Sequence, residues 1–146
     1  MTSASSLTEQ LAVSLTRASQ ESDRIRARWA LLDWLACVAG ARRSPLAQRL
    51  ASAQIPARER AAWLGNLLEM DDIHRNSILH PGPAIWPALF ATPGGDAMDK
   101  LLDAALAGYE AIIAVGATCD ARHYAHFHPT TTAGLIGAAA AAAIRL

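Results

Sequence analysis

Apolar residues recur at helical spacing along most of the chain, and capping residues mark where helices begin. Ser6 and Glu9 form a capping-box pair ahead of a first helix that carries Leu7, Leu11 and Leu15. Ser44-Pro45 starts a third helix, with proline where its missing N–H does no harm, and Pro56 opens a fourth that runs towards Glu69.

The second helix is the longest in the first half of the chain. Ser22 can cap it, and Gly40 stands where we expect it to stop. Its apolar positions repeat every three or four residues. We expect the inner, core-facing side to carry Ile25, Trp29, Leu32, Leu35, Ala36 and Ala39.

The second half alternates loops with helices. His80-Pro81-Gly82-Pro83 is typical of a loop, and Asp96 can cap the helix that runs to about Cys119. The expected segments are a loop at Ile73–Pro83, a short helix at Ala84–Ala91, a loop at Asp120–His128 and a small-residue helix at Thr130–Leu146. No strand alternation is present, so we predict an all-α bundle of about six to seven helices, forming a single helical domain over residues 1–146.

The composition indicates which kinds of partner the protein can bind. Hydrophobic residues make up 52% of the chain and charged residues 18%, a balance that suggests surface reserved for a partner or an oligomer interface. The net charge is zero, which gives no electrostatic footprint for nucleic acid. The most apolar windows, Ala104–Ala117 and Ala133–Ile144, are shorter than the ~20 residues that span a bilayer. Cys37 and Cys119 look like core residues in a reducing compartment, so we expect a cytoplasmic protein without membrane contact.

Acidic and imidazole side chains concentrate between Glu69 and Pro87. Glu69 and Asp72 are three residues apart, so we expect them to share a helix face while Asp71 points elsewhere. His80 follows in a loop made rigid by proline. An imidazole titrates near neutral pH, so His80 suits general acid–base chemistry.

A second loop holds His123, His126 and His128. Imidazoles with carboxylates nearby could bind zinc or iron, although the spacing H-x-x-H-x-H is not a well-known ligand pattern. His128 is the better candidate for catalysis, because Pro129-Thr130-Thr131 places it at a helix N-terminus. Free N–H groups and the positive dipole end there favour an anionic substrate.

Four segments in this order resemble the MmgE/PrpD family. They are Glu69-Met-Asp-Asp-Ile-His, His80-Pro-Gly-Pro-Ala-Ile-Trp-Pro-Ala-Leu, Leu106-Ala-Gly-Tyr-Glu and Phe127-His-Pro-Thr-Thr-Thr-Ala-Gly-Leu-Ile-Gly. The family includes 2-methylcitrate dehydratase, cis-aconitate decarboxylase and iminodisuccinate epimerase. The resemblance implies the start of a large helical domain, over which a smaller α/β lid domain closes in the family.

The resemblance also implies a reaction and roles for residues. It implies metal-independent and cofactor-free proton abstraction next to a carboxylate, followed by elimination or epimerisation. By position, Glu69 corresponds to an active-site aspartate, and His80 and His128 to active-site histidines. We therefore expect Glu69, Asp72, His80 and His128 to be catalytic, and His74, Thr130 and Thr131 to bind a small carboxylated substrate.

The resemblance covers only the first part of the family's length, without the lid domain or the later lysine and histidine of the site. We expect a second polypeptide to supply them, so that the chain is a subunit or short form of a lyase. Two alternatives remain open: a stand-alone helical dimer that uses the pocket for binding or another reaction, and a histidine–carboxylate metal protein.

Overall fold

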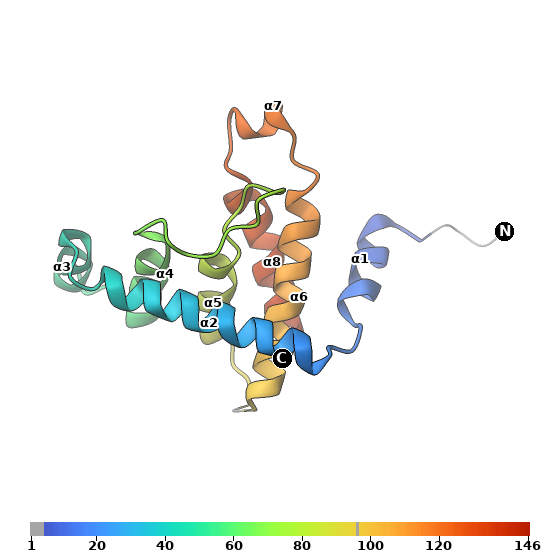
Figure 1. Ribbon diagram of the computed structural model, residues 1–146, viewed down its shortest axis with the longest axis horizontal. Helices are drawn as coiled ribbons and strands as arrows, with labels where there is room; N and C mark the ends of the chain where they lie inside the picture. The colour runs from blue at the N-terminus through green and yellow to red at the C-terminus, as the bar shows by residue number, and fades with distance from the viewer. Residues whose placement is uncertain (1–4, 96) are drawn as a thin grey trace.

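The computed structural model describes residues 5–95 and 97–146, and this part of the chain contains eight helices and no strand (Figure 1). The helices are α1 (Leu7–Leu15), α2 (Glu21–Ala41), α3 (Pro45–Ser52), α4 (Ala57–Asn66), α5 (Gly82–Ala91), α6 (Met98–Gly116), α7 (Ala121–Tyr124) and α8 (Pro129–Arg145). An all-α fold is therefore confirmed. The helix beyond the six or seven predicted is α7, a single turn inside the predicted histidine loop.

Most predicted helix starts are confirmed, because local capping determines them. The Ser6–Glu9 capping box forms with both of its hydrogen bonds, and the Ser44 hydroxyl accepts the backbone N–H of Ala47. Pro56 occupies the position before the first residue of α4, as predicted, and Pro129 occupies the first turn of α8. The predicted cap at Asp96 lies outside the described residues.

The core forms where α6 and α8 lie side by side, with α5 packed against both and α2 crossing in front of α5 and α6 (Figure 1). The largest fully buried side chains are Trp86, Leu79, Ile85, Leu89, Leu102 and Ile112. A Cβ on Gly108 would lie 3.1 Å from the Gly137 carbonyl oxygen, and one on Gly137 would lie 2.9 Å from that of Gly108. Glycine at both positions lets α6 and α8 approach backbone to backbone.

Three predictions about α2 are wrong. The helix is capped at Gln20, whose backbone N–H donates to Asp23, so Ser22 is not the cap. Gly40 does not stop it, since the helix continues to Ala41. The expected inner face points outward, and the residues that are buried are Ala27, Trp34, Cys37, Val38 and Ala41. Apolar residues occupy both faces of α2, so periodicity alone could not select the buried one.

The segment between α4 and α5 is a loop, here called the site loop (residues 67–81). It starts earlier than expected because α4 ends at Asn66. Glu69 and Ile78 adopt left-handed backbone conformations, with φ of 51° and 47°. A bridge between His74 and Leu79 closes the loop on itself, and buried Leu79 anchors it beside Ile112 and Ala133. The site loop is thereby fixed across one end of α6 and α8.

Candidate functional site

His80 is the centre of the predicted acid–histidine cluster, and its nearest carboxylate is Asp71. The His80 Nδ1 lies 2.9 Å from an Asp71 carboxylate oxygen, and the Asp71 side chain is completely buried. Asn66 donates its side-chain amide to both oxygens of that carboxylate, at 3.0 and 3.2 Å. An ionised carboxylate accepts only, so in the neutral imidazole the proton sits on His80 Nδ1, and Nε2 carries the free lone pair.

The expectation that Asp71 points away from the site is therefore wrong. It assumed that α4 continues through Asp72, whereas α4 ends at Asn66 and the chain turns at Glu69. Glu69 and Asp72 consequently do not share a helix face. Sequence reasoning missed Asp71 and Asn66, and a signal was present, because Asp71 is nine residues before His80 at the other end of the same loop.

Glu69 reaches the opposite side of the His80 ring. Its carboxylate lies 3.8 Å from His80 Nε2, too far for a hydrogen bond, and its side chain is 73% exposed. Glu69 and Asp71 thus flank the two ring nitrogens, one from solvent and one from the interior. A proton taken up at Nε2 would place the imidazolium between two negative charges.

Asp72 lies on the core side of the loop, where protein donors occupy both of its oxygens. The Gly82 N–H donates to one oxygen at 2.8 Å, and the Tyr109 hydroxyl donates to the other at 2.5 Å. Trp86 donates its indole N–H to that same hydroxyl, at 3.2 Å. A Cβ on Gly82 would lie only 2.7 Å from the Asp72 carboxylate, so the close approach requires glycine there.

Burial dominates the electrostatics of this second network. It raises the pKa of Asp72 above its ordinary value, against the opposing hydrogen bonds from Tyr109 and Gly82. Burial, followed by the neighbouring Asp72 charge, likewise raises the pKa of Tyr109. Both groups therefore favour their protonated forms more than they would in water. The geometry makes Asp72 a residue that fastens the site loop to α5 and α6.

His128 comes close to His80 through Thr130. The two imidazole rings are 6.2 Å apart between centroids. The Thr130 hydroxyl accepts the backbone N–H of His80 at 2.8 Å, and the Thr130 backbone N–H donates to His128 Nδ1 at 3.2 Å. One residue at the start of α8 thus positions both histidines. Because His128 Nδ1 accepts a hydrogen bond, its proton is on Nε2.

The N-terminus of α8 does not offer the free N–H groups that the sequence suggested. Pro129 has none, and the backbone N–H of Thr130 donates to the His128 side chain. The N–H groups of Thr131 and Thr132 both donate to the His128 carbonyl, at 3.0 and 3.4 Å. His128 therefore caps its own helix and occupies the donors predicted for a substrate.

Neither His74 nor Thr131 makes a hydrogen bond to the imidazole ring of His80 or His128. His74 Nδ1 lies 3.0 Å from the Ser77 hydroxyl, which donates to the Ile113 carbonyl on α6. The Thr131 hydroxyl donates to the His128 carbonyl at 2.7 Å and is exposed. Both contacts hold the local backbone in place.

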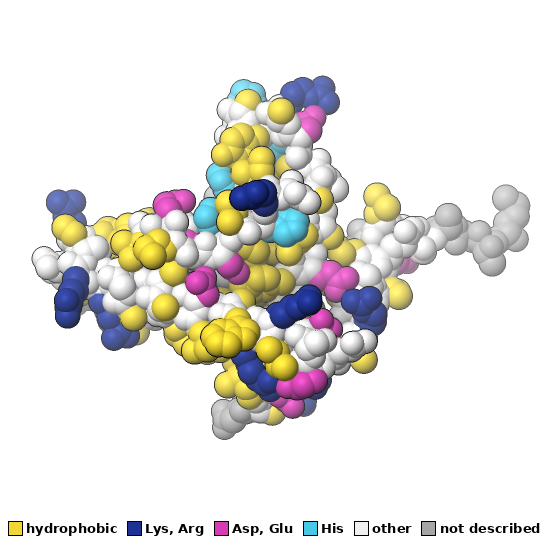
Figure 2. Space-filling view, viewed as in Figure 1, with side chains coloured by type: hydrophobic (Ala, Val, Ile, Leu, Met, Phe, Trp, Pro, Cys, Tyr) yellow, Lys and Arg dark blue, Asp and Glu magenta, His cyan; other side chains and the backbone are white. Residues whose placement is uncertain are grey.

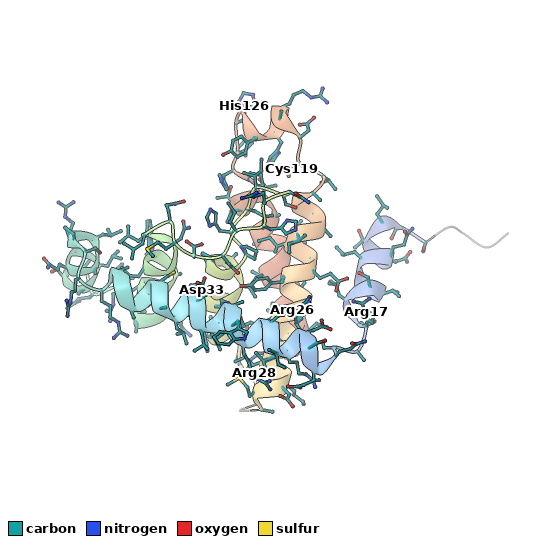
Figure 3. The ribbon with its side chains drawn as sticks, viewed as in Figure 1. Arg17, Arg26, Arg28, Asp33, Cys119 and His126 are labelled. Carbon is teal, nitrogen blue, oxygen red and sulfur yellow. The ribbon has the colours of Figure 1, made fainter. Side chains whose placement is uncertain are left out.

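The cluster is open to solvent on one side. Figure 2 shows histidine side chains gathered below the α7 loop, with acidic side chains between them and α2. Glu69 and His128 are both exposed. His126, labelled in Figure 3, projects from the tip of the α7 loop, away from the cluster. Within residues 5–95 and 97–146, no group of three histidine, cysteine or acidic side chains is arranged to hold a metal ion.

Fold and site together define a helical domain with an acid–base cluster between one loop and the start of its last helix. The model of the MmgE/PrpD N-terminal domain matches residues 60–146, which include the whole cluster. The chain belongs to the MmgE/PrpD family, which includes dehydratases and other lyases. No curated protein and no solved structure matches the chain. In the described part of the chain, none of the helices has the length and apolar character needed to cross a membrane.

Proposed function

We propose that the chain is a subunit or short form of a MmgE/PrpD-like lyase acting on a small carboxylated substrate. The observation that carries this proposal is the buried Asp71 carboxylate held 2.9 Å from His80 Nδ1. A buried acid that fixes the tautomer of an imidazole and leaves its other nitrogen free is the arrangement of a general base. The reaction needs no metal or cofactor, since a base and an acid suffice.

In the dehydration form of the reaction, His80 Nε2 takes a proton from the carbon next to the substrate carboxylate. The electron pair of that C–H bond forms the new double bond, and the hydroxyl group leaves from the neighbouring carbon. His128 Nε2–H donates the proton that turns the leaving hydroxide into water. In the decarboxylation form, the C–C bond to a carboxylate breaks, carbon dioxide leaves, and the electron pair left on carbon takes the proton of His128 Nε2–H. Glu69 stabilises the imidazolium that forms at His80, and Asp72 positions the loop.

The exposure of the cluster supports a second polypeptide that completes the site. Elimination next to a carboxylate needs a site from which water is excluded, whereas Glu69 and His128 lie in solvent. In the described part of the chain, none of the acids around His80 forms an ion pair with lysine or arginine. The covering polypeptide would close the site and bring the positive charge that binds the substrate carboxylate. Cys37 and Cys119 are both free, consistent with a reducing, cytoplasmic setting.

Proton abstraction can be measured separately from elimination, as exchange of a substrate proton with solvent deuterium. The chain is incubated in D₂O with 2-methylcitrate, cis-aconitate or iminodisuccinate, and loss of the C–H signal next to the carboxylate is followed by proton NMR. We expect exchange or turnover with at least one of them, and a loss of 10²-fold or more in His80→Gln and Asp71→Asn. His126→Gln is the matched control, because that histidine lies outside the cluster.

A chain that gives no exchange is then assayed with the polypeptides that co-purify with it from its own cells. Exchange that appears only in this complex, and is lost in His80→Gln, supports the split-site form of the proposal. No exchange in either setting, together with saturable binding of a carboxylate, would show instead that the pocket is a binding site. Turnover that survives His80→Gln contradicts the proposed base.

A further inference from the structure

The face of α2 that points away from the core is apolar from Ile25 to Ala39. Its large residues are Ile25, Trp29, Leu32 and Leu35, which are 46%, 68%, 55% and 43% exposed. Ala36 and Ala39 continue the same stripe, and both are exposed. In Figure 1 no other element is drawn in front of α2. A helix that is apolar on both faces is normally buried on both.

The stripe follows a heptad repeat. Ser22, Trp29 and Ala36 take the first core position of the repeat (a), and Ile25, Leu32 and Ala39 take the second (d). This alternating spacing of three and four residues runs through three heptads, which is all of α2. Such a seam fits a second helix with the same repeat.

The charged residues beside the seam determine the orientation. In a parallel pair, each residue just before an a position meets the residue five places later in the other helix. Glu21 then meets Arg26 of the second copy, and Arg28 meets Asp33, so both contacts join opposite charges. In Figure 3, Arg28 projects from one edge of α2, and Arg26 and Asp33 lie along the other edge.

An antiparallel pair centred on Leu32 would instead bring Asp33 beside Asp33 of the second copy. Like charges at such a position are destabilising. The third edge contact also favours the parallel pair, since Leu35 would meet Gly40 of the second copy. Gly40 lies beside the side chain of Leu68, since a Cβ on Gly40 would be 3.3 Å from a Leu68 methyl group, and Leu68 is 40% exposed. Leu35 of the second copy would therefore meet an apolar surface.

We propose that two copies of this chain dimerise through α2 as a parallel, in-register, two-stranded coiled coil. Within one copy, Arg28 already contacts Glu21 at 2.7 Å and Asp99 at 3.5 Å, and its side chain remains 42% exposed. The guanidinium can therefore also form an ion pair with Asp33 of the other copy. This dimer is separate from the proposed lyase activity, because none of the α2 seam residues belongs to the acid–histidine cluster.

Charge reversal tests the interface in the full chain. The oligomeric state is measured by sedimentation velocity at micromolar concentrations, with circular dichroism to verify folding. We expect a dimer for the wild type and a dissociation constant at least tenfold weaker for Arg28→Glu and for Asp33→Arg. The double variant R28E/D33R should recover the dimer, because it restores opposite charges. Leu32→Asp should be monomeric, and Leu135→Asp, at an exposed leucine on α8, should remain dimeric.

Disulfide cross-linking tests the orientation. In a Cys119→Ser background, Ile25→Cys places its thiol beside the same residue of the second copy only in a parallel pair. We expect rapid formation of this disulfide and none for Leu135→Cys. A disulfide that forms instead between a mixture of Ile25→Cys and Ala39→Cys chains would show an antiparallel pair. A wild-type chain that is monomeric at all concentrations, or whose α2 face is covered by a different polypeptide, would overturn the proposal.

Discussion

At the scale of single residues, the two nitrogens of His80 lie in different surroundings. Nδ1 is tied to the buried Asp71, and Nε2 faces the exposed Glu69 at 3.8 Å. The exposed Glu69 side chain can change its position when a ligand binds, whereas the buried Asp71 side chain is held in place by its neighbours. Asp71 is therefore suited to fixing the ring, and Glu69 to interacting with the charge that comes and goes at Nε2.

The backbone of Glu69 gives a way to separate its function from its contribution to stability. Its φ of 51° is unfavourable for a side chain other than glycine. We expect Glu69→Gly to leave the free energy of unfolding unchanged or to raise it by about 1 kcal/mol, and to lower proton exchange at least tenfold. Stability is measured by urea unfolding and exchange by NMR.

Ile78→Gly is the control for this substitution. Ile78 has a φ of 47° in the same loop and carries no acid–base group, so its replacement should change stability similarly and keep the exchange rate. A Glu69→Gly variant that exchanges as fast as the wild type would remove Glu69 from the site.

The chemical composition of the cluster could be predicted from the sequence, but not its pairing. Glu69, His80 and His128 were identified from residue type and position, and the structure brings their side chains together. The pairing depends on where α4 ends, and no glycine or proline at Asn66 signals that end. A helix extended by two turns exchanges the roles of Asp71 and Asp72, because each residue turns the side-chain direction by about 100°.

At the scale of secondary-structure elements, the contact between α6 and α8 explains why the last helix is rich in small residues. A Cβ on Gly137 would lie 2.7 Å from the Cβ of Ile112 as well as 2.9 Å from the Gly108 carbonyl. The small-residue helix predicted at Thr130–Leu146 forms as α8, and its small side chains permit this close packing. The outward face of α2 could not be predicted in the same way. Both faces of this helix carry apolar residues, so the sequence does not indicate which face packs against the rest of the chain.

We expect Gly137→Ala to lower the free energy of unfolding by about 1–3 kcal/mol, because the added methyl group must push α8 away from α6. Urea unfolding followed by circular dichroism measures the change. Gly95→Ala is the control, because a Cβ there meets nothing within 4 Å. Equal stability of Gly137→Ala and the wild type would mean that α6 and α8 can move apart enough to hold the methyl group without a loss of stability.

At the scale of the whole molecule, two ion pairs join the first turns of α2 to α6, Arg28 with Asp99 and the shorter Arg24 with Asp103. Arg24 donates to both Asp103 oxygens, at 2.8 and 2.9 Å, across 79 residues of sequence. The two helices also pack against each other along the core. The Arg24–Asp103 pair therefore lies at the far end of α2 from α4, where it fixes the direction in which α2 crosses the molecule (Figure 1).

The Arg24–Asp103 pair makes the fold sensitive to acid. The hydrogen bond from Arg24 holds the pKa of Asp103 below its ordinary value. A carboxyl group with a depressed pKa in the folded state contributes stability above its unfolded pKa of about 3.9, and loses it as the pH falls through the folded pKa. Arg24→Gln should therefore be less stable than the wild type at pH 6, and the two should converge towards pH 2.

Urea midpoints measured between pH 2 and pH 7 test this convergence. Arg122→Gln is the matched control, because its partner Asp120 is exposed and has its pKa lowered mainly by the backbone N–H of His123, which the substitution keeps. Its midpoint should follow the wild type at every pH. Asp72 contributes with the opposite sign, because its pKa is raised, so stability from that group falls as the pH rises above about 3.9. Curves for Arg24→Gln and the wild type that stay parallel down to pH 2 would show that the pair does not stabilise the fold.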